Sequence, residues 1–560
     1  MTTAVRAPID GRSLRAPVRW DRAGWGVVVG ALVIWSAARA GFDVTAIVNE
    51  RGLGQVTDFF SASVDPVLTA DFLRLTAREA GTTLGYALLG TILSLVIGVF
   101  GGLLVSERLW TPTSATAPAG PGRWVWRTSR LLFAIPRSMH EVVFGLLLVN
   151  ILGLDPMVAV LAIAIPFGAV TAKVFAELID ESPRSAERAL RAGGSGRLIA
   201  LAFGVVPHAL GDLLSYSFYR FECAIRSAAV LGIVGAGGLG FQLALSFQSL
   251  RYDEMWTQLW ALIIISGLAD AWSASVRRRR AAQIGELRID RDPNRTERRD
   301  PVLAGSFLAL AAAVPLAWWW LELDVTTLWS DRARTLTAEL ADDSWPPTVG
   351  DGGWSTLIDQ SINTLAMAVL ALAMASTLAA AVAFVAQRPK RRPTDLGGLA
   401  TMIAAAATRF ILLLARAVPP PVWALLAVFA FRPGIWPGAI ALGLYNLGVL
   451  GRLQAEVVEN LDDRPADAMQ AAGARPSGSF LFATVPAVSG RFVALGLYRW
   501  EVAVRETVMV GVVGVAGLGR RLSEQTSSFD YDGIASTLLA LLAITVLVDV
   551  ASAAIRRTIR

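Results

Sequence analysis

The chain carries one sequence motif twice, 279 residues apart. The first copy reads Tyr-Arg-Phe-Glu from Tyr219 and the second reads Tyr-Arg-Trp-Glu from Tyr498, each followed by an arginine and a glycine-rich apolar run. The same offset relates further pairs, namely Arg137 and Arg416, Gly194 and Gly473, Pro207 and Pro486, and Tyr252 and Tyr531. A register kept over this distance without insertion indicates two copies of one structural unit. The chain of 560 residues is therefore predicted to fold as a fused pseudo-dimer.

Composition places the chain among integral membrane proteins. Hydrophobic residues make up 54% of it, charged residues make up 17%, and the mean hydropathy is +0.52. The net charge is +6, but the arginines gather in short stretches between apolar segments. That placement follows the positive-inside rule for membrane topology and argues against a nucleic-acid partner. A single cysteine, Cys223, excludes an internal disulfide, and with only two histidines no metal site is expected.

The alternation of apolar and arginine-bearing segments predicts an all-α membrane protein with six spans in each half, about 12 in total. We expect first-half spans near 25–41, 82–105, 131–148, 157–174, 209–232 and 255–271, and second-half spans near 303–321, 362–386, 402–429, 437–453, 487–511 and 533–551. The halves cover 1–276 and 301–560, joined by a charged cytoplasmic linker at 277–300. An even number of spans gives both halves one orientation, with both termini in the cytoplasm.

A charged segment too polar to cross a membrane separates the fourth and fifth spans of each half. In the second half Asp467-Ala468-Met469 is followed by Gly473 and, thirteen residues later, by Pro486. The first half keeps this spacing from Gly194 to Pro207, but Arg188-Ala189-Leu190 stands at the start, with Glu187 one position early. The glycine is expected to turn between two short helices, and the proline to begin the next membrane helix. A loop lying on the lipid surface would also be charged, but its recurrence at one spacing favours a functional role.

This segment resembles the cytoplasmic coupling loop of bacterial ABC importer permeases, whose pattern is Glu-Ala-Ala, three residues, Gly, and then Leu-Pro. The Tyr-Arg-Phe/Trp-Glu motif with its glycine-rich run resembles the phosphonate-type permeases of the type I importer fold, as do the stretches that begin at Arg137 and Arg416. The resemblance covers nearly all of both halves. It implies that the coupling residues contact an ATPase subunit; these are Glu187, Ala189, Gly194, Pro207, Asp467, Ala468, Gly473 and Pro486.

The resemblance also implies a permease subunit in the bacterial cell membrane, fed by a periplasmic or lipid-anchored solute-binding protein. Two copies of the ATPase would bind ATP and Mg²⁺, and one fused chain would replace the usual pair of permeases. The chain itself has no Gly-Lys-Ser/Thr phosphate loop, because its lysines, Lys173 and Lys390, do not follow glycine. We therefore expect no catalytic residue and no cofactor in this chain.

Charges within the expected spans are candidate pathway residues. Glu222 and Arg226 are four residues apart, as are Glu501 and Arg505, so each pair lies on one helix face. These pairs either neutralise themselves and hold helices together, or their arginines attract an anion along the transport path. The candidate set is Arg137, Ser138, Tyr219, Glu222, Arg226, Arg416, Tyr498, Glu501 and Arg505.

Three functions remain open at this point. The first is import of a phosphonate or phosphate-type oxyanion. The second is the same architecture with another cargo, such as methionine, thiamine or ferric ion. The third is a secondary transporter built from two parallel six-span halves, which leaves the recurring Gly-to-Pro spacing unexplained.

Overall fold

A computed structural model describes residues 20–41, 48–110, 122–289, 301–350, 352–388 and 396–559. Regular structure in these residues is helical, apart from one isolated bridge between Val48 and Phe431. The first half contains α1 Trp20–Ala40, α3 Glu50–Ser61, α4 Ala70–Val105, α5 Glu107–Trp110, α6 Gly122–Ser138, α7 Glu141–Leu152, α8 Pro156–Glu181, α9 Ser185–Ala192, α10 Arg197–Gly204, α11 Val206–Leu231, α12 Gly238–Gln248 and α13 Tyr252–Ile289.

The second half repeats this order. It contains α14 Pro301–Trp320, α15 Asp331–Asp343, α16 Gly353–Ala386, α17 Leu396–Ala417, α18 Pro420–Ala430, α19 Ile435–Glu459, α20 Arg464–Ala471, α21 Pro476–Ser479, α22 Val485–Val512, α23 Leu518–Ser527 and α24 Tyr531–Ile559. Short 3₁₀ turns occupy Ala62–Val64 and Val325–Trp329, and short π turns occupy Gly232–Ala236 and Phe480–Thr484. Helices α9 and α20 begin and end 279 residues apart, which confirms the tandem repeat.

Small side chains let the main helix pair of each half pack closely. In α16 a stripe at every fourth position, Ala371, Ala375, Ala379 and Ala383, is fully buried, and α16 packs along α19. In the first half α4 packs along α8 in the same way, and a Cβ added at Gly98 would meet Thr171 Cγ2 at 2.4 Å. Without a hydrophobic driving force inside a bilayer, such small-residue stripes are a main source of helix association.

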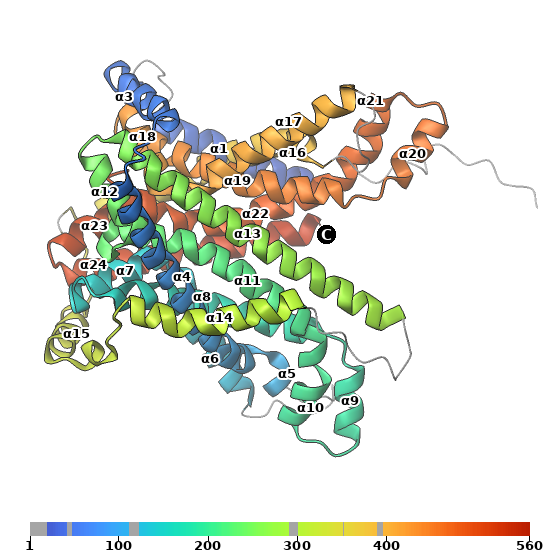
Figure 1. The fold of residues 1–560 in the computed structure, drawn as a ribbon, viewed down its shortest axis with the longest axis horizontal. Coiled ribbons are helices and arrows are strands. Elements are labelled where there is room, and N and C mark those ends of the chain that lie inside the picture. The colour runs from blue at the N-terminus through green and yellow to red at the C-terminus, as the bar shows by residue number, and fades with distance from the viewer. Residues whose placement is uncertain are drawn as a thin grey trace, which may run out of the picture.

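The two halves exchange their first helices. Helix α1 of the first half packs against α16, and α14 of the second half packs against α4 (Figure 1). The Arg39 guanidinium at the end of α1 bonds Asn363 Oδ1 at 3.1 Å and forms an ion pair with Asp359 of α16. On the other side, Trp320 Nε1 donates to Thr82 Oγ1 at 3.4 Å. Each half is therefore completed by a helix from the other, which interlocks the pseudo-dimer.

The expected number of spans, about 12, is not confirmed. By length and composition, seven helices in the described residues qualify as membrane spans, or nine if two bent pairs each count as one. The span predicted at 131–148 is wrong as a single helix, because α6 and α7 meet there at 83°. The segment predicted at 402–429 likewise divides into α17 and α18. Prolines explain the second break, since Pro419, Pro420 and Pro421 offer no N–H for a continuous helix.

The predicted coupling segments project from the same end of the molecule. Figure 1 shows α20 and α21 of the second half at the upper right and α9 and α10 of the first half at the lower right, with α3 and α15 on the left. Parallel halves place equivalent segments on one side. The two halves therefore have the same orientation relative to each other.

Candidate functional site

A cavity of about 620 Å³ lies between the two halves. Its walls come from α7, α8 and α11 of the first half and from α19 and α22 of the second, with Arg277, Arg416 and Pro420 completing them. Seven arginines and four glutamates line it, namely Arg220, Arg226, Arg277, Arg416, Arg452, Arg499 and Arg505, with Glu141, Glu222, Glu456 and Glu506. Ionisable groups inside a membrane protein usually face such a cavity, because contact with lipid would cost several kcal/mol.

One wall of the cavity holds a compact set of ion pairs, the closed cluster, made of Glu222, Arg226, Asp270, Arg416 and Arg452. Arg416 Nη1 lies 2.8 Å from Glu222 Oε1, and its Nη2 lies 2.9 Å from Asp270 Oδ2. Arg226 Nη2 is 3.7 Å from the same Glu222 oxygen. The carboxylates belong to α11 and α13, whereas Arg416 and Arg452 belong to α17 and α19. The closed cluster therefore joins the two halves.

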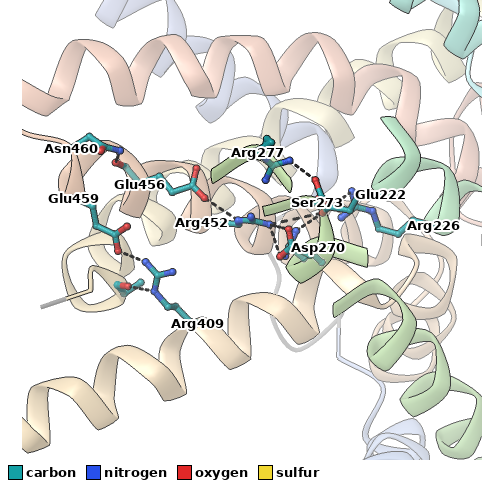
Figure 2. A network of polar contacts seen from close by, with 12 residues as sticks. Glu222, Arg226, Asp270, Ser273, Arg277, Arg409, Arg452, Glu456, Glu459 and Asn460 are labelled. Atoms are coloured by element: carbon teal, nitrogen blue, oxygen red, sulfur yellow. Dashed lines mark hydrogen bonds and ion pairs between the residues drawn. The ribbon is translucent and has the colours of Figure 1, made fainter. Parts of the chain in front are cut away.

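The Arg452 guanidinium bonds two carboxylates of this region at once. Its Nη1 lies 2.9 Å from Asp270 Oδ1 and 3.0 Å from Asp270 Oδ2, and its Nε donates to Glu456 Oε1 at 3.0 Å. Figure 2 shows the Arg452 side chain lying between these two carboxylates. A planar guanidinium can serve two acceptors at once in this way, which an ammonium group does less well.

The equivalent residues of the other half, Glu501, Arg505, Asp549, Arg137 and Lys173, form what we name the open cluster. Glu501 pairs with Arg556 of α24, and Lys173 Nζ is 3.7 Å from Glu177. Arg505 Nη1 donates to the carbonyl oxygen of Arg137 at 2.7 Å. Among the described residues, no ion pair within 4.0 Å joins Arg137 or Lys173 to Glu501 or Asp549.

The spacing argument for two self-neutralising pairs is correct for one pair only. Glu222 and Arg226 do meet, but Glu222 is closer to Arg416. The self-neutralising alternative does not describe Glu501 and Arg505, because Arg505 donates to the backbone oxygen of Glu501 at 3.3 Å while the Glu501 carboxylate meets Arg556. Neighbouring helices supplied better partners than the residue one turn away.

Most of the candidate pathway residues face the cavity. Those that line it are Tyr219, Glu222, Arg226, Arg416, Tyr498 and Arg505, whereas Arg137, Ser138 and Glu501 do not. Sequence reasoning missed Arg220 and Arg499, although both stand inside the repeated motif, and it missed Arg452 and Asp270. Aligning the two copies residue by residue could have singled out Arg220 and Arg499, because the residues that surround these two arginines differ between the copies.

Except for the two prolines, the coupling residues lie on two helical hairpins, α9 with α10 and α20 with α21. Gly194 has φ +87° and Gly473 has φ +90°, a left-handed conformation that strongly favours glycine, so the predicted turns are confirmed. Pro207 and Pro486 stand in the first turns of α11 and α22, as expected. The residues Ala189, Gly194, Asp467, Ala468 and Gly473 are exposed.

Glu187 is the exception among the coupling residues. It is buried, and its Oε2 lies 3.3 Å from Arg108 Nη1. Arg108 also donates to the carbonyl oxygen of Asp180 at 2.8 Å. The Glu187 carboxylate thus fastens the first hairpin to α5 and to the end of α8, whereas Ala189, Gly194 and Pro207 are exposed.

Comparison with known proteins supplies the context for this geometry. The phosphite transport system permease protein PtxC of Stutzerimonas stutzeri is 34% identical over 254 residues, which cover 45% of this chain and 88% of the relative. The phosphate-import permease protein PhnE of Mycolicibacterium smegmatis is 27% identical over 478 residues, covering 85% of this chain and 84% of the relative. The first relative therefore corresponds to about half of this chain, whereas the second spans both halves.

Among solved structures, the MetNI methionine ABC transporter in an inward-facing conformation matches 38% of this chain and 98% of its own at 22% identity, with a TM-score of 0.32. The family described as binding-protein-dependent transport system inner membrane component matches this chain twice, over residues 111–276 and 397–560. The first match begins before α6 and ends within α13, and the second begins at the start of α17 and ends after α24. The chain accordingly belongs to this family of membrane transport components and carries two copies of its domain.

Proposed function

We propose that this chain is the complete membrane-spanning part of an ABC importer for phosphorus oxyanions, with its two halves in the places of two permease subunits. The relatives named for phosphite and phosphate transport support this substrate class. The relative that matches about half of this chain supports the view that a single fused chain replaces a pair. In this proposal the protein transports but does not hydrolyse ATP.

The observation that carries the proposal is the charge of the cavity between the halves. Seven arginines against four glutamates leave it positive. Arginine suits a tetrahedral oxyanion, because its planar fork donates two parallel hydrogen bonds to neighbouring oxygens. Methionine is a zwitterion without net charge, and thiamine and ferric ion are cations, so a positively charged cavity favours an oxyanion over all three.

The energy would come from two copies of a partner ATPase that bind ATP and Mg²⁺. We place one copy against the hairpin at Gly194 and the other against the hairpin at Gly473, since both hairpins project from the same end (Figure 1). That end would face the cytoplasm, together with both termini. A solute-binding protein would then dock at the opposite end, over α3 and α15.

The test is uptake by proteoliposomes that contain this chain, its ATPase and its solute-binding protein. We expect ATP-dependent uptake of labelled phosphite, phosphate or methylphosphonate, and none of methionine or thiamine. An ATPase variant that cannot hydrolyse ATP should abolish uptake. Uptake driven by an ion gradient without ATP would favour the secondary transporter, and uptake of methionine, thiamine or ferric ion alone would contradict the substrate class.

A further inference from the structure

Arg220 and Arg499 occupy equivalent positions in the two copies, and both line the cavity. In the second half the Arg499 guanidinium has both a carboxylate and an amide oxygen as partners. Its Nη2 lies 2.7 Å from Glu506 Oε1, and its Nε donates to Asn446 Oδ1 at 2.7 Å. Asn446 Nδ2 in turn donates to Glu506 Oε2 at 3.0 Å. The charge of Arg499 is thus neutralised within its own half.

Both partners of Arg499 are missing at the equivalent positions of the first half. Phe167 stands where Asn446 would be, and Ser227 stands where Glu506 would be, each 279 residues earlier. The Arg220 guanidinium lies over the Phe167 ring, 4.5 Å from its centroid. Among the described residues it has no carboxylate within 4.0 Å.

Uncharged aromatic groups hold Arg220 in place. Its Nε donates to the Tyr216 hydroxyl at 2.9 Å, and its guanidinium lies 5.3 Å from the centre of the Tyr216 ring. The side chain is only 9% exposed, yet it lines the cavity. Aromatic faces attract a cation without cancelling its charge. Arg220 therefore keeps a full positive charge at the cavity wall.

The first half also contributes the carboxylate of Glu141 to the cavity wall, but this carboxylate is bonded to groups other than Arg220. Glu141 Oε1 accepts a hydrogen bond from the Ser227 hydroxyl, and Glu141 Oε2 lies 3.2 Å from His140 Nε2. In the second half the equivalent of Glu141 is Pro420. In the second half the carboxylate of Glu506 thus bonds the motif arginine, whereas in the first half the carboxylate of Glu141 bonds Ser227 and His140.

We propose that Arg220 is the oxyanion-binding residue of the cavity, so that the pseudo-dimer binds one anion at its first-half wall instead of two at symmetric positions. The proposal rests on the proposed function for the identity of the anion, a phosphorus oxyanion. The half-exposed Tyr219 and Tyr498 line the same cavity. Their hydroxyls supply neutral donors for the remaining oxygens of a phosphate.

The test measures equilibrium binding of labelled inorganic phosphate to the purified full chain in lipid nanodiscs, without the ATPase or the solute-binding protein. We expect one phosphate per chain. Arg220→Gln should weaken binding about 10- to 100-fold, which corresponds to losing one charge-assisted hydrogen-bond set. Arg220→Lys keeps the charge but loses the fork, and it should retain part of the affinity.

Two matched variants separate this site from the general charge of the cavity. Arg499→Gln/Glu506→Gln removes the equivalent arginine together with its partner, and it should leave phosphate affinity within about twofold of the unmodified chain, because no unpaired charge is lost. Ser227→Glu/Glu141→Gln moves a carboxylate to the position of Glu506 without changing the net charge. It should weaken binding as much as Arg220→Gln does.

Binding of two phosphates per chain would overturn the proposal. So would equal losses in Arg220→Gln and Arg499→Gln/Glu506→Gln, or unchanged affinity in Ser227→Glu/Glu141→Gln. Absence of binding for phosphate, phosphite and methylphosphonate alike would contradict it as well. If Arg220→Gln does not fold, the relocation variant and Arg220→Lys decide the outcome. Uptake by the complete importer is a separate measurement, so the proposed function and this site can fail independently.

Discussion

The closed and open clusters use equivalent positions on the two sides of the cavity, and they differ in every contact between the halves. Arg416 reaches both Glu222 and Asp270 across the interface, at 2.8 and 2.9 Å. Its equivalent, Arg137, contributes only its backbone oxygen, which accepts from Arg505 at 2.7 Å. Buried ion pairs thus join the halves on one side, whereas a hydrogen bond from Arg505 to a backbone oxygen joins them on the other.

Two substitutions explain this difference. Arg452 corresponds to Lys173, so the residue that bridges Asp270 and Glu456 becomes an ammonium group that reaches Glu177 alone, at 3.7 Å. Gly448 corresponds to Ala169, and a Cβ at Gly448 would stand 2.7 Å from the backbone nitrogen of Arg416. The missing Cβ lets α17 approach α19 closely enough for Arg416 to enter the interface. A fused chain can acquire such asymmetry because its two copies mutate independently.

The largest expected effect separates Asp270 from its equivalent Asp549. Asp270→Ala removes the carboxylate shared by Arg416 and Arg452, leaving two largely buried guanidinium groups undercompensated. We expect a loss of about 3–5 kcal/mol in the free energy of unfolding. Asp549→Ala should cost less than about 1 kcal/mol, since no close partner is lost. Denaturant unfolding of both variants in one detergent checks this, and equal losses would contradict the asymmetry.

A second comparison concerns the two coupling hairpins. Glu187→Gln removes the charged partner of buried Arg108 and should destabilise the first hairpin by about 1.5–3 kcal/mol. Asp467→Asn in the exposed second hairpin should leave stability unchanged but lower the ATPase activity that uptake requires. Hydrogen exchange of the hairpins, measured beside coupled ATP hydrolysis, distinguishes the two. Faster hydrogen exchange in both variants would show that the acidic side chain stabilises each hairpin, which contradicts the predicted difference.

Gly448→Ala tests whether the close approach of α17 to α19 allows Arg416 to form its ion pairs across the interface. The added Cβ would meet Arg416 N and Leu412 O, each at 2.7 Å, so α17 must move outward. We expect a loss of about 1–3 kcal/mol from overpacking. Ala169→Gly is the matched control in the first half, and it should cost no more than about 1 kcal/mol. A Gly448→Ala variant as stable as the parent would remove the packing explanation.

Valine at the turn glycines tests the hairpins as coupling elements. Gly194→Val and Gly473→Val each place a branched residue at positive φ, which strains the turn by about 1–2 kcal/mol. We expect both variants to reach the membrane, and importers assembled with them to hydrolyse ATP in the partner ATPase without transporting. Unchanged uptake per ATP hydrolysed in either variant would exclude that hairpin from coupling.

The smallest expected effect is a gain. Lys173→Arg supplies the open cluster with the fork that Arg452 supplies to the closed cluster, and it should stabilise the protein by less than about 1 kcal/mol, as exposed pairs do. The side chain of Lys173 is 40% exposed, so solvent screens any new pair. A gain of several kcal/mol would mean that the guanidinium alone, with alanine still at position 169, is enough to form the ion pairs across the interface.

The sequence by itself determined the class, the repeat and the family. The all-helical membrane fold follows from apolar length and arginine placement, and the pseudo-dimer follows from a constant offset, because both are written in periodicity along the chain. The turns at Gly194 and Gly473 are local as well, since a single left-handed residue sets them. Such features need no knowledge of which helices meet.

Only the tertiary structure decided how the charges pair and where the apolar segments bend. The spacing of four residues predicted Glu222 with Arg226, yet the closest partner of Glu222 is Arg416, 194 residues away. The spacing from Glu501 to Arg505 was equally suggestive, but Arg556 on another helix holds that carboxylate. Inside a low-dielectric bundle, a charge pairs with whichever opposite charge the packing brings nearest, because the alternative is to leave it buried and unpaired. Helix packing sets that distance, and it brings together residues that local spacing cannot relate.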